Sequence, residues 1–448
     1  MQIVRMKFVR DTAVLQVGTA LNMAATLLTS IVVFRGLEAD GYGVYRLAVA
    51  LYGMLTTLNL TGLGLSTVVR LSAALARHDS DTALDLMAFY VKVSVWVGAV
   101  GVALAFALGP PVANALYGTP TVGELARWLA LLLVLDPVHM LVALTLQSCR
   151  HMARLTLLHA VLTLAELGLI VAAVLGGHGP GGVIAARLGA SALIGAFAVV
   201  YYARLRAHLH AGLPSWRAVI GRVAGVPMRA YLGFGFGIAL DKNVASLFTL
   251  LPLQVLGSLH GEAAAGYLGL AQSAISMPSS AFNAVMSNLG VKLPQDAGRG
   301  DFGALGRNFS RVTLALAAGG VVMFGLFALA APWLLPLLYG DEALPAVPLM
   351  GVMALYGVIG AAGGSMGALY RALEKVQLAL VAKLAALAAI ALPGYLLIRD
   401  HAELGAAWTV TLVLALSVAL TAALVLPHLN RLVADARAVS VQPAENER

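Results

Sequence analysis

Long apolar stretches separated by short polar connections run along almost the whole chain. A helix needs about 20 mostly apolar residues to cross a membrane, and barrel strands would instead show a period of two. Twelve stretches have the required length: 13–34, 45–68, 85–108, 124–147, 153–175, 181–203, 230–256, 263–290, 308–330, 345–369, 374–398 and 403–427. Because lipid offers the backbone no hydrogen-bond partner, the pattern predicts an all-α membrane protein with twelve transmembrane helices.

The composition agrees with a chain that is solvated by lipid. Of its 448 residues, 60% are hydrophobic and only 11% are charged, whereas a typical soluble domain has about 25% charged residues. The net charge of +8 does not indicate a nucleic-acid partner, because the basic residues lie in the gaps between apolar runs. A single cysteine, Cys149, excludes an intrachain disulfide and is interpreted as an inert thiol.

Basic residues alternate strongly between the two sides of the predicted bundle. The N-terminus, the even-numbered connections and the C-terminus together carry 21 Lys and Arg residues, and the odd-numbered connections carry 3. The positive-inside rule therefore places both termini in the cytoplasm. The first apolar run lacks a convincing cleavage site and is interpreted as an uncleaved span. We expect a multi-pass membrane protein.

The connection between the sixth and seventh spans is the longest and the most basic. Trp216, Val219, Ile220 and Val223 recur at helical spacing within it. This pattern predicts a short amphipathic helix on the inner membrane surface, attracted by anionic lipid. Docking of a partner protein is the alternative.

The two halves of the chain share landmarks in the same order. LGPPVANALYG at 108–118 matches LAAPWLLPLLYG at 329–340, with the LYG triplets 222 positions apart. ADGYGVYRLAVA at 39–50 matches AAAGYLGLAQSA at 263–274, and GTALN at 18–22 matches GIALD at 237–241. The pattern predicts two parallel six-helix repeats around a central cavity, which is a transporter architecture. The expected domains are an N-terminal lobe at 1–203, a linker at 204–229, a C-terminal lobe at 230–430 and a tail at 431–448.

These features resemble those of a known superfamily, the multidrug/oligosaccharidyl-lipid/polysaccharide exporters. Within it, the chain is most similar to the bacterial oligosaccharide-lipid flippases, which translocate O-antigen and exopolysaccharide units. The resemblance rests on R-x-L-x-x-x-G-Y-G-x-Y at 35–45, the two LYG triplets, the basic linker and AQSAISMPSSAFNAVMSNLGVKLP at 271–294. It covers nearly the whole chain, although each motif is loose by itself.

The resemblance implies a flippase rather than an enzyme. Such proteins move an undecaprenyl-diphosphate-linked oligosaccharide between the leaflets of the inner membrane through a commonly cationic cavity, and several are thought to be ion-driven. The expected partners are this lipid-linked glycan, membrane lipid, and the polysaccharide polymerase with its chain-length machinery, but no nucleic acid. A cation-coupled multidrug exporter of the same superfamily is the alternative, and a membrane polymerase or ligase is a less favoured one.

Ionisable residues inside the predicted spans are the candidates for function, because each costs roughly 2.5–3.5 kcal/mol on insertion and usually faces a cavity. Asp241 and Lys242 lie near the middle of the seventh span, where Lys242 would attract a diphosphate or an acidic sugar. An interhelical structural ion pair is the other interpretation. The full set of candidate substrate-binding residues is Lys242, Lys383, Lys92, Arg187 and Asn22, the last of which matches Asp241 in the repeat.

Three carboxylates are candidates for ion coupling: Asp241, Glu166 and Asp136. Glu166 looks like a lone carboxylate in the fifth span, where lipid would favour its neutral form and suit proton coupling. Asp136 precedes Pro137, so a local kink with a polar cap explains it equally well. His139 and His159 are interpreted as packed histidines.

Several classes of chemistry find no support in the sequence. It contains no Walker A motif, no Cys/His metal cluster and no Gly-x-Ser-x-Gly elbow. We therefore expect no metal and no cofactor, with coupling to Na+ or H+ left open. Pro278 and Pro393 are expected to bend the eighth and eleventh spans.

Overall fold

The computed structural model describes residues 2–57, 63–149, 151–209, 212–227 and 229–441, and every regular element in these residues is a helix. Two compact units are formed by Met1–Asn243 (unit 1) and Val244–Arg448 (unit 2). Within the described residues, eight helical segments are long and apolar enough to cross a membrane. The all-α membrane class is therefore confirmed, whereas the number of twelve spans stays a prediction.

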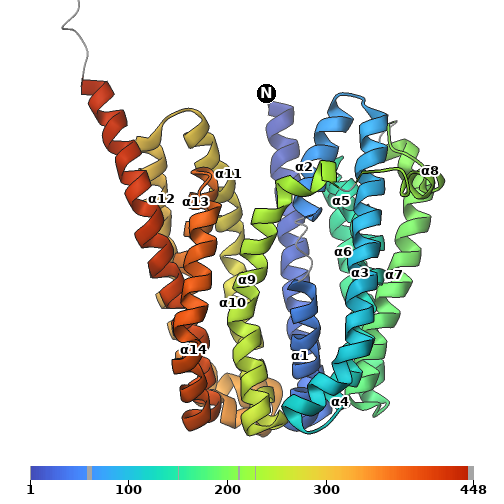
Figure 1. Ribbon diagram of the computed structural model, residues 1–448, viewed down its shortest axis with the longest axis vertical. Coiled ribbons are helices and arrows are strands. Elements are labelled where there is room, and N and C mark those ends of the chain that lie inside the picture. Colours follow the sequence, from blue (N-terminus) through green and yellow to red (C-terminus); the bar gives the residue numbers. More distant parts are fainter. Residues whose placement is uncertain (1, 58–62, 150, 210–211, 228, 442–448) are drawn as a thin grey trace, which may run out of the picture. The chain divides into compact units, whose positions relative to one another are not determined.

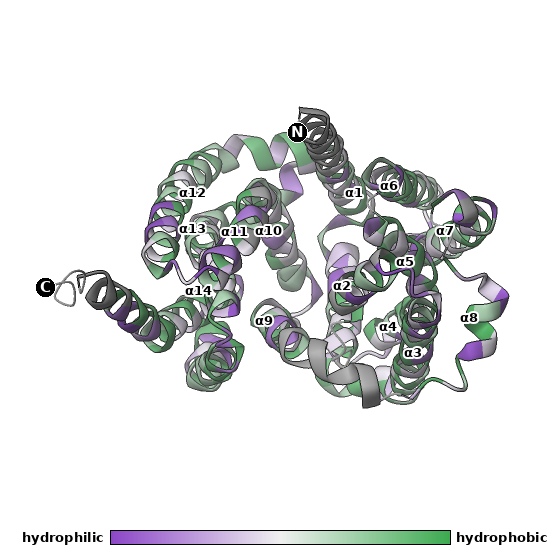
Figure 2. Ribbon diagram, turned by 90° about the horizontal axis from the view of Figure 1, so that it is seen from above, coloured by the Kyte–Doolittle hydropathy of each residue, from purple (hydrophilic) through white to green (hydrophobic). Residues whose placement is uncertain are grey.

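Unit 1 is built around a central helix. Its elements are α1 (Gln2–Thr57), α2 (Leu63–Ala76), α3 (Ser80–Tyr117), α4 (Thr121–Leu129), α5 (Leu132–Ser148), α6 (Met152–Leu175), α7 (Gly179–Leu209), α8 (Trp216–Arg222) and the first part of α9 (Arg229–His260). α5 contacts α2, α3, α6 and α7, which surround it in Figure 2. Its buried Leu141 and Leu146 share one apolar core with Phe89 of α3 and Tyr202 of α7. Side chains of α5 therefore lie close to most other helices of the unit.

Unit 2 repeats this plan with different element lengths. It contains the rest of α9, α10 (Glu262–Ala281), α11 (Asn283–Gly298), α12 (Phe302–Tyr339), the 3-10 helix η1 (Asp341–Ala346), α13 (Val347–Ala372) and α14 (Val376–Val441) (Figure 1). Here α13 is the central helix, in contact with α10, α11, α12 and α14. α13 follows the second LYG triplet as α4 and α5 follow the first.

The landmarks of the sequence repeat occupy equivalent places in the two units. α3 and α12 are both 38 residues long. Asp79 and Asp301 cap their N-termini by accepting a hydrogen bond from the backbone N–H three residues further on. Each helix ends at the tyrosine of its LYG triplet, and Gly118 and Gly340 follow with φ of 73° and 92°, a conformation that favours glycine. The LYG triplets are therefore helix stops.

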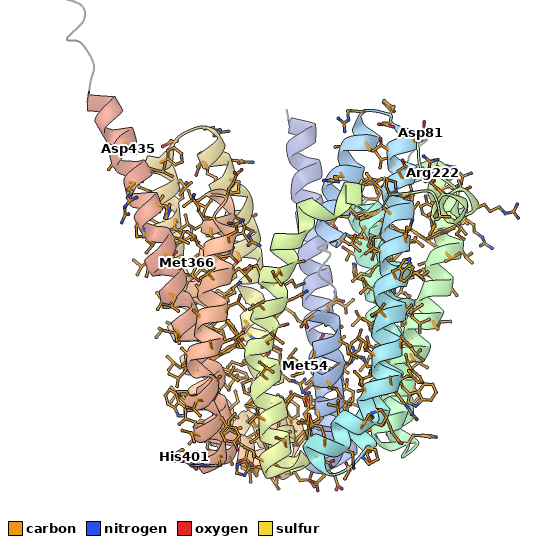
Figure 3. The ribbon with its side chains drawn as sticks, in the orientation of Figure 1. Met54, Asp81, Arg222, Met366, His401 and Asp435 are labelled. Atoms are coloured by element: carbon orange, nitrogen blue, oxygen red, sulfur yellow. The ribbon has the colours of Figure 1, made fainter. Side chains whose placement is uncertain are left out.

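Two very long helices each contain a reversal of the chain. α14 includes the predicted spans 374–398 and 403–427, which are separated at Ala402, a non-helical residue with φ of 46°. Figure 3 places His401 and Asp435 at opposite ends of unit 2, so the second half of α14 runs the length of the unit. Gly405 makes the tight turn feasible, because a side chain there would collide with the carbonyl of Leu397. Glu38 marks a similar break in α1.

The predicted proline bends had mixed outcomes. Pro278 lies near the end of α10, and the helix is interrupted at Phe282 before α11 begins. Pro137 lies six residues into α5, just after the break that separates α4 from α5. Pro393 lies inside α14 with no break at its own position. Residues 58–62 of one predicted span and residues 442–448 of the predicted tail lie outside the described residues.

Candidate functional site

An ion pair joins α6 and α7 within the apolar part of unit 1. Arg187 Nε lies 2.9 Å from Glu166 Oε1, and the two side chains are 29% and 31% exposed. Arg187 Nη1 also donates a hydrogen bond of 3.2 Å to the hydroxyl of Tyr45 on α1. The expectation that Glu166 is a lone carboxylate is therefore wrong, because a guanidinium neutralises it. Loss of either partner would leave an unpaired charge in an apolar setting.

Asp136 occupies a different position, in the first turns of α5. Ser191 Oγ on α7 donates a 2.6 Å hydrogen bond to Asp136 Oδ1. No ion pair of Asp136 is found among the described residues. A neutral hydroxyl from α7 therefore contacts this carboxylate.

The local sequence explains how Asp136 is placed. Pro137 has no N–H for the carbonyl of Leu133, and the chain turns irregularly at Ala130 and Leu131 before α5 begins. Gly98 on α3 lets that region approach closely, since a β-carbon there would lie 2.9 Å from the Leu133 carbonyl oxygen. The start of α5 is thus held against α3.

Asn22 binds a neighbouring helix of the same unit. Thr163 Oγ1 on α6 lies 2.9 Å from Asn22 Oδ1 and also 2.9 Å from the carbonyl oxygen of His159. The contact ties α1 to α6. A role for Asn22 in substrate binding stays a prediction.

Lys92 is held by the linker between the predicted lobes. Its ammonium group donates hydrogen bonds of 3.1 Å and 2.8 Å to the carbonyls of Ala224 and Val226. Val226 is almost fully buried, at 2% exposure. The lysine therefore caps the segment that follows α8, and its proposed role in binding substrate stays a prediction.

The linker itself is docked on unit 1 by apolar and aromatic contacts. Trp216 packs edge-on against Tyr202, with ring centres 5.1 Å apart, and Val219 is fully buried. The Tyr202 hydroxyl donates to the carbonyl of Pro214 at 2.7 Å. At the end of α8, Arg222 Nε lies 2.6 Å from Asp85 Oδ1. Arg222 and Asp81, which is also in the first turns of α3, lie at the same end of unit 1 in Figure 3.

The remaining predicted residues are Asp241 and Lys242 on α9 and Lys383 on α14. Asp241 is buried, at 6% exposure, whereas the adjacent Lys242 is exposed, which agrees with the divergence of neighbouring side chains on a helix. Lys383 in unit 2 lies with its Nζ 5.7 Å from the ring centre of Tyr370. Their roles in binding and coupling stay predictions.

One further charged cluster links α11 to α12, with Lys292 and Asp296 between two predicted spans and Asn308 at the first residue of span 308–330. Lys292 Nζ and Asn308 Nδ2 donate to the two carboxylate oxygens of Asp296 at 2.7 Å and 2.8 Å. The hydrogen bond from Lys292 is the main cause that holds the pKa of Asp296 below its usual range, and Asn308 adds to it. The cluster fastens α11 to α12.

The sequence interpretation missed the neutral partners of the charged residues. Ser191 lies four positions after Arg187, so both are on one face of α7. Tyr45 and Tyr52 are seven positions apart on α1, which again is one face. Polar residues at these spacings around a membrane charge were the signal that could have identified them. Among the described residues, no group of three His, Cys, Asp or Glu residues is placed to hold a metal ion.

The fold of the chain is similar to those of several solved membrane proteins. It is similar to an inward-facing multidrug resistance MATE family transporter of the MOP superfamily, with a TM-score of 0.68 and 14% identity over 93% of this chain and 95% of that chain. The eukaryotic MATE transporter AtDTX14 gives a TM-score of 0.69 at 13% identity over 96% and 99% of the two chains. The MATE multidrug transporter DinF-BH gives a TM-score of 0.67 at 17% identity over 94% and 96% of the two chains. At these identities the likeness concerns the fold alone.

The sequence assigns the family. The model of the polysaccharide biosynthesis protein family matches residues 8–289, which is more than half of the chain. The chain therefore belongs to the polysaccharide biosynthesis protein family, and the suspected exporter superfamily is confirmed. No curated protein matches it.

Proposed function

We propose that this protein flips an undecaprenyl-diphosphate-linked oligosaccharide repeat unit across the bacterial inner membrane by alternating access. Membership of the polysaccharide biosynthesis family is the observation that carries the proposal. A transporter fold supplies the means for movement, since neighbours with this fold transport substrates across membranes. Assembly of O-antigen or exopolysaccharide is the process in which such a step is needed.

The architecture proposed for this activity is two six-helix lobes with both termini in the cytoplasm. The matching ends of α3 and α12 support a duplicated unit, and the 21-to-3 distribution of basic residues supports the orientation. Lys242 and Lys383 are the proposed contacts for the diphosphate or for acidic sugars.

Because Cys149 is the single cysteine, a Cys149→Ser background allows one new cysteine at a time to be labelled from either side of the membrane.

The decisive experiment follows the fate of the lipid-linked repeat unit. Deletion of the gene is expected to leave these units on the cytoplasmic leaflet, and expression of the intact protein is expected to restore their translocation. Normal translocation in the deletion strain would contradict the proposal.

Drug export is the second candidate, favoured by the similarity to multidrug MATE transporters over 93–96% of the chain. It predicts that the deletion strain becomes sensitive to lipophilic cationic dyes and drugs while its glycan assembly stays normal. The flippase proposal predicts the reverse pattern, so the same strain separates the two.

A further inference from the structure

Two acidic groups in the apolar helices of unit 1, Glu166 and Asp136, are balanced differently. Glu166 has a guanidinium partner 2.9 Å away, and that guanidinium is also engaged by Tyr45. Asp136 accepts its hydrogen bond from the neutral hydroxyl of Ser191. An ionised Asp136 therefore carries a charge that the ion pair on α6 and α7 does not cancel, in a helix that is apolar enough to cross the membrane.

His139 lies beside this carboxylate. It is three positions after Asp136 on α5, so the two side chains share one face of the helix. His139 is buried, at 5% exposure, and its Nδ1 has no hydrogen-bond partner among the described residues. An imidazole nitrogen and a carboxylate can share one proton, and the pair then carries no net charge.

The helices around the pair carry other titratable groups, among them His159 and the Glu166–Arg187 ion pair. Further groups on these helices include Tyr52 of α1, Arg70 of α2, Tyr90 of α3 and Tyr202 of α7. Arg70 lies on α2, two residues after Val68. The carbonyl of Val68 accepts a hydrogen bond from Ser148, at the other end of α5 from Asp136. Lys92 of α3 is held by the linker carbonyls.

We propose that Asp136 and His139 together bind one proton and form the coupling site of the transporter, with Glu166–Arg187 as a permanently paired structural element beside it. The proposal rests on the proposed transport function. The proton comes from water and is held by the imidazole Nδ1 or the carboxylate. The empty site carries one negative charge and the loaded site carries none. Because lipid penalises net charge in a membrane segment, loading favours states in which the site is closed to water.

The test measures proton binding directly, without substrate. Histidine-labelled full-length protein in lipid nanodiscs is titrated by NMR, with the His139 signal assigned by its loss in His139→Gln. In the wild type, the His139 signal is expected to titrate as a single step. In Asp136→Asn, its midpoint is expected to fall by about 1 pH unit or more, because the neighbouring negative charge is gone. The charge-balanced double variant Glu166→Gln/Arg187→Gln is the matched control and should leave the midpoint nearly unchanged.

Three results would overturn the proposal: a His139 signal that does not titrate, a midpoint unaffected by Asp136→Asn, or a midpoint that moves with sodium concentration at constant ionic strength. The last would assign the site to sodium. If Asp136→Asn does not fold, Ser191→Ala tests the same network, because loss of the hydroxyl changes the charge distribution on the carboxylate and should shift the midpoint. Since no glycan is present, the titration decides the proton site even if the wild type proves not to flip lipid-linked oligosaccharide.

Discussion

The two units share a helical plan but differ in what their interiors contain. Unit 1 holds charged side chains within its apolar helices, including the Glu166–Arg187 pair and Asp136. In the described part of unit 2, the ion pairs Lys292–Asp296 and Arg399–Asp400 lie near connections between helices. Lys383, whose ammonium group lies beside the ring of Tyr370, differs from these pairs because it lies inside a predicted span.

The interior polar groups of unit 2 are mainly hydroxyls that bond to their own helices. Thr409 Oγ1 donates to the carbonyl of Gly405 and Thr411 Oγ1 to that of Ala407, four residues earlier in each case. Ser365 donates to the carbonyl of Ala362 and receives a hydrogen bond from Thr313. Such groups are satisfied locally and carry no charge. The comparison teaches that two units with similar helix ends, at Tyr117 and Tyr339, have interiors of different chemistry.

The largest expected effect comes from breaking the ion pair in unit 1. Arg187→Gln leaves Glu166 without a cation and is expected to lower the free energy of unfolding by about 3 kcal/mol. Chemical denaturation in detergent measures the loss. The double variant Glu166→Gln/Arg187→Gln removes both charges and should recover most of it. A double variant as unstable as the single one would show that charge balance is not what distinguishes this interior.

The next effect concerns the lysine that holds the linker. Lys92→Met removes two hydrogen bonds to the carbonyls of Ala224 and Val226, with an expected cost of about 2 kcal/mol. Residues near 224 should also be cleaved faster by protease. Lys383→Met, which changes a membrane lysine of unit 2, is the control and should leave linker cleavage unchanged. Equal cleavage in both variants would argue against the Lys92 contact.

The stability that the Lys292–Asp296–Asn308 cluster gives to unit 2 is expected to depend on pH. Because the pKa of Asp296 is lowered in the folded protein by Lys292 and Asn308, its stabilisation is complete above the unfolded value of about 3.9. It is lost as the pH falls through that value and toward the lower folded pKa. Asp296→Asn should therefore lose less stability than the wild type between pH 5 and pH 3, by about 1 kcal/mol. Parallel acid-unfolding curves for the two proteins would contradict this expectation.

The smallest effect is expected at the surface of the linker. Arg222 and Asp85 form an ion pair whose side chains are 52% and 24% exposed. Exposed pairs contribute about 0.2–1 kcal/mol, so Arg222→Gln should lower the melting temperature only slightly and leave the linker docked through Trp216 and Val219. A loss as large as that of Lys92→Met would show that charge, not apolar contact, holds α8.

The sequence predicted most of the fold because lipid makes apolar length informative. The LYG triplets marked real helix stops, and Pro278 marked the interruption between α10 and α11. The reversals at Glu38 and Ala402 fall inside the predicted connections 35–44 and 399–402, although neither residue is a glycine, the residue that positive φ favours.

The candidate site was predicted only as a set of charged residues. Glu166 and Arg187 are 21 positions apart, and their pairing depends on how α6 and α7 face each other. Lys92 finds its partners in a linker more than 130 positions away. Hydropathy gives the cost of a charge inside the membrane but does not identify its partner. That Glu166 has a cationic partner and Asp136 a neutral one is therefore visible only in the structure.

The contact between Lys92 and the linker has a consequence for biogenesis. All its atoms belong to unit 1, which is synthesised before unit 2, Val244–Arg448. At ribosomal rates of about 5–20 residues per second, translation of unit 2 takes roughly 10–40 s. The first bundle can therefore complete its own hydrogen bonds, and fix the point from which the next helices emerge, while the rest of the polypeptide is still leaving the translocon.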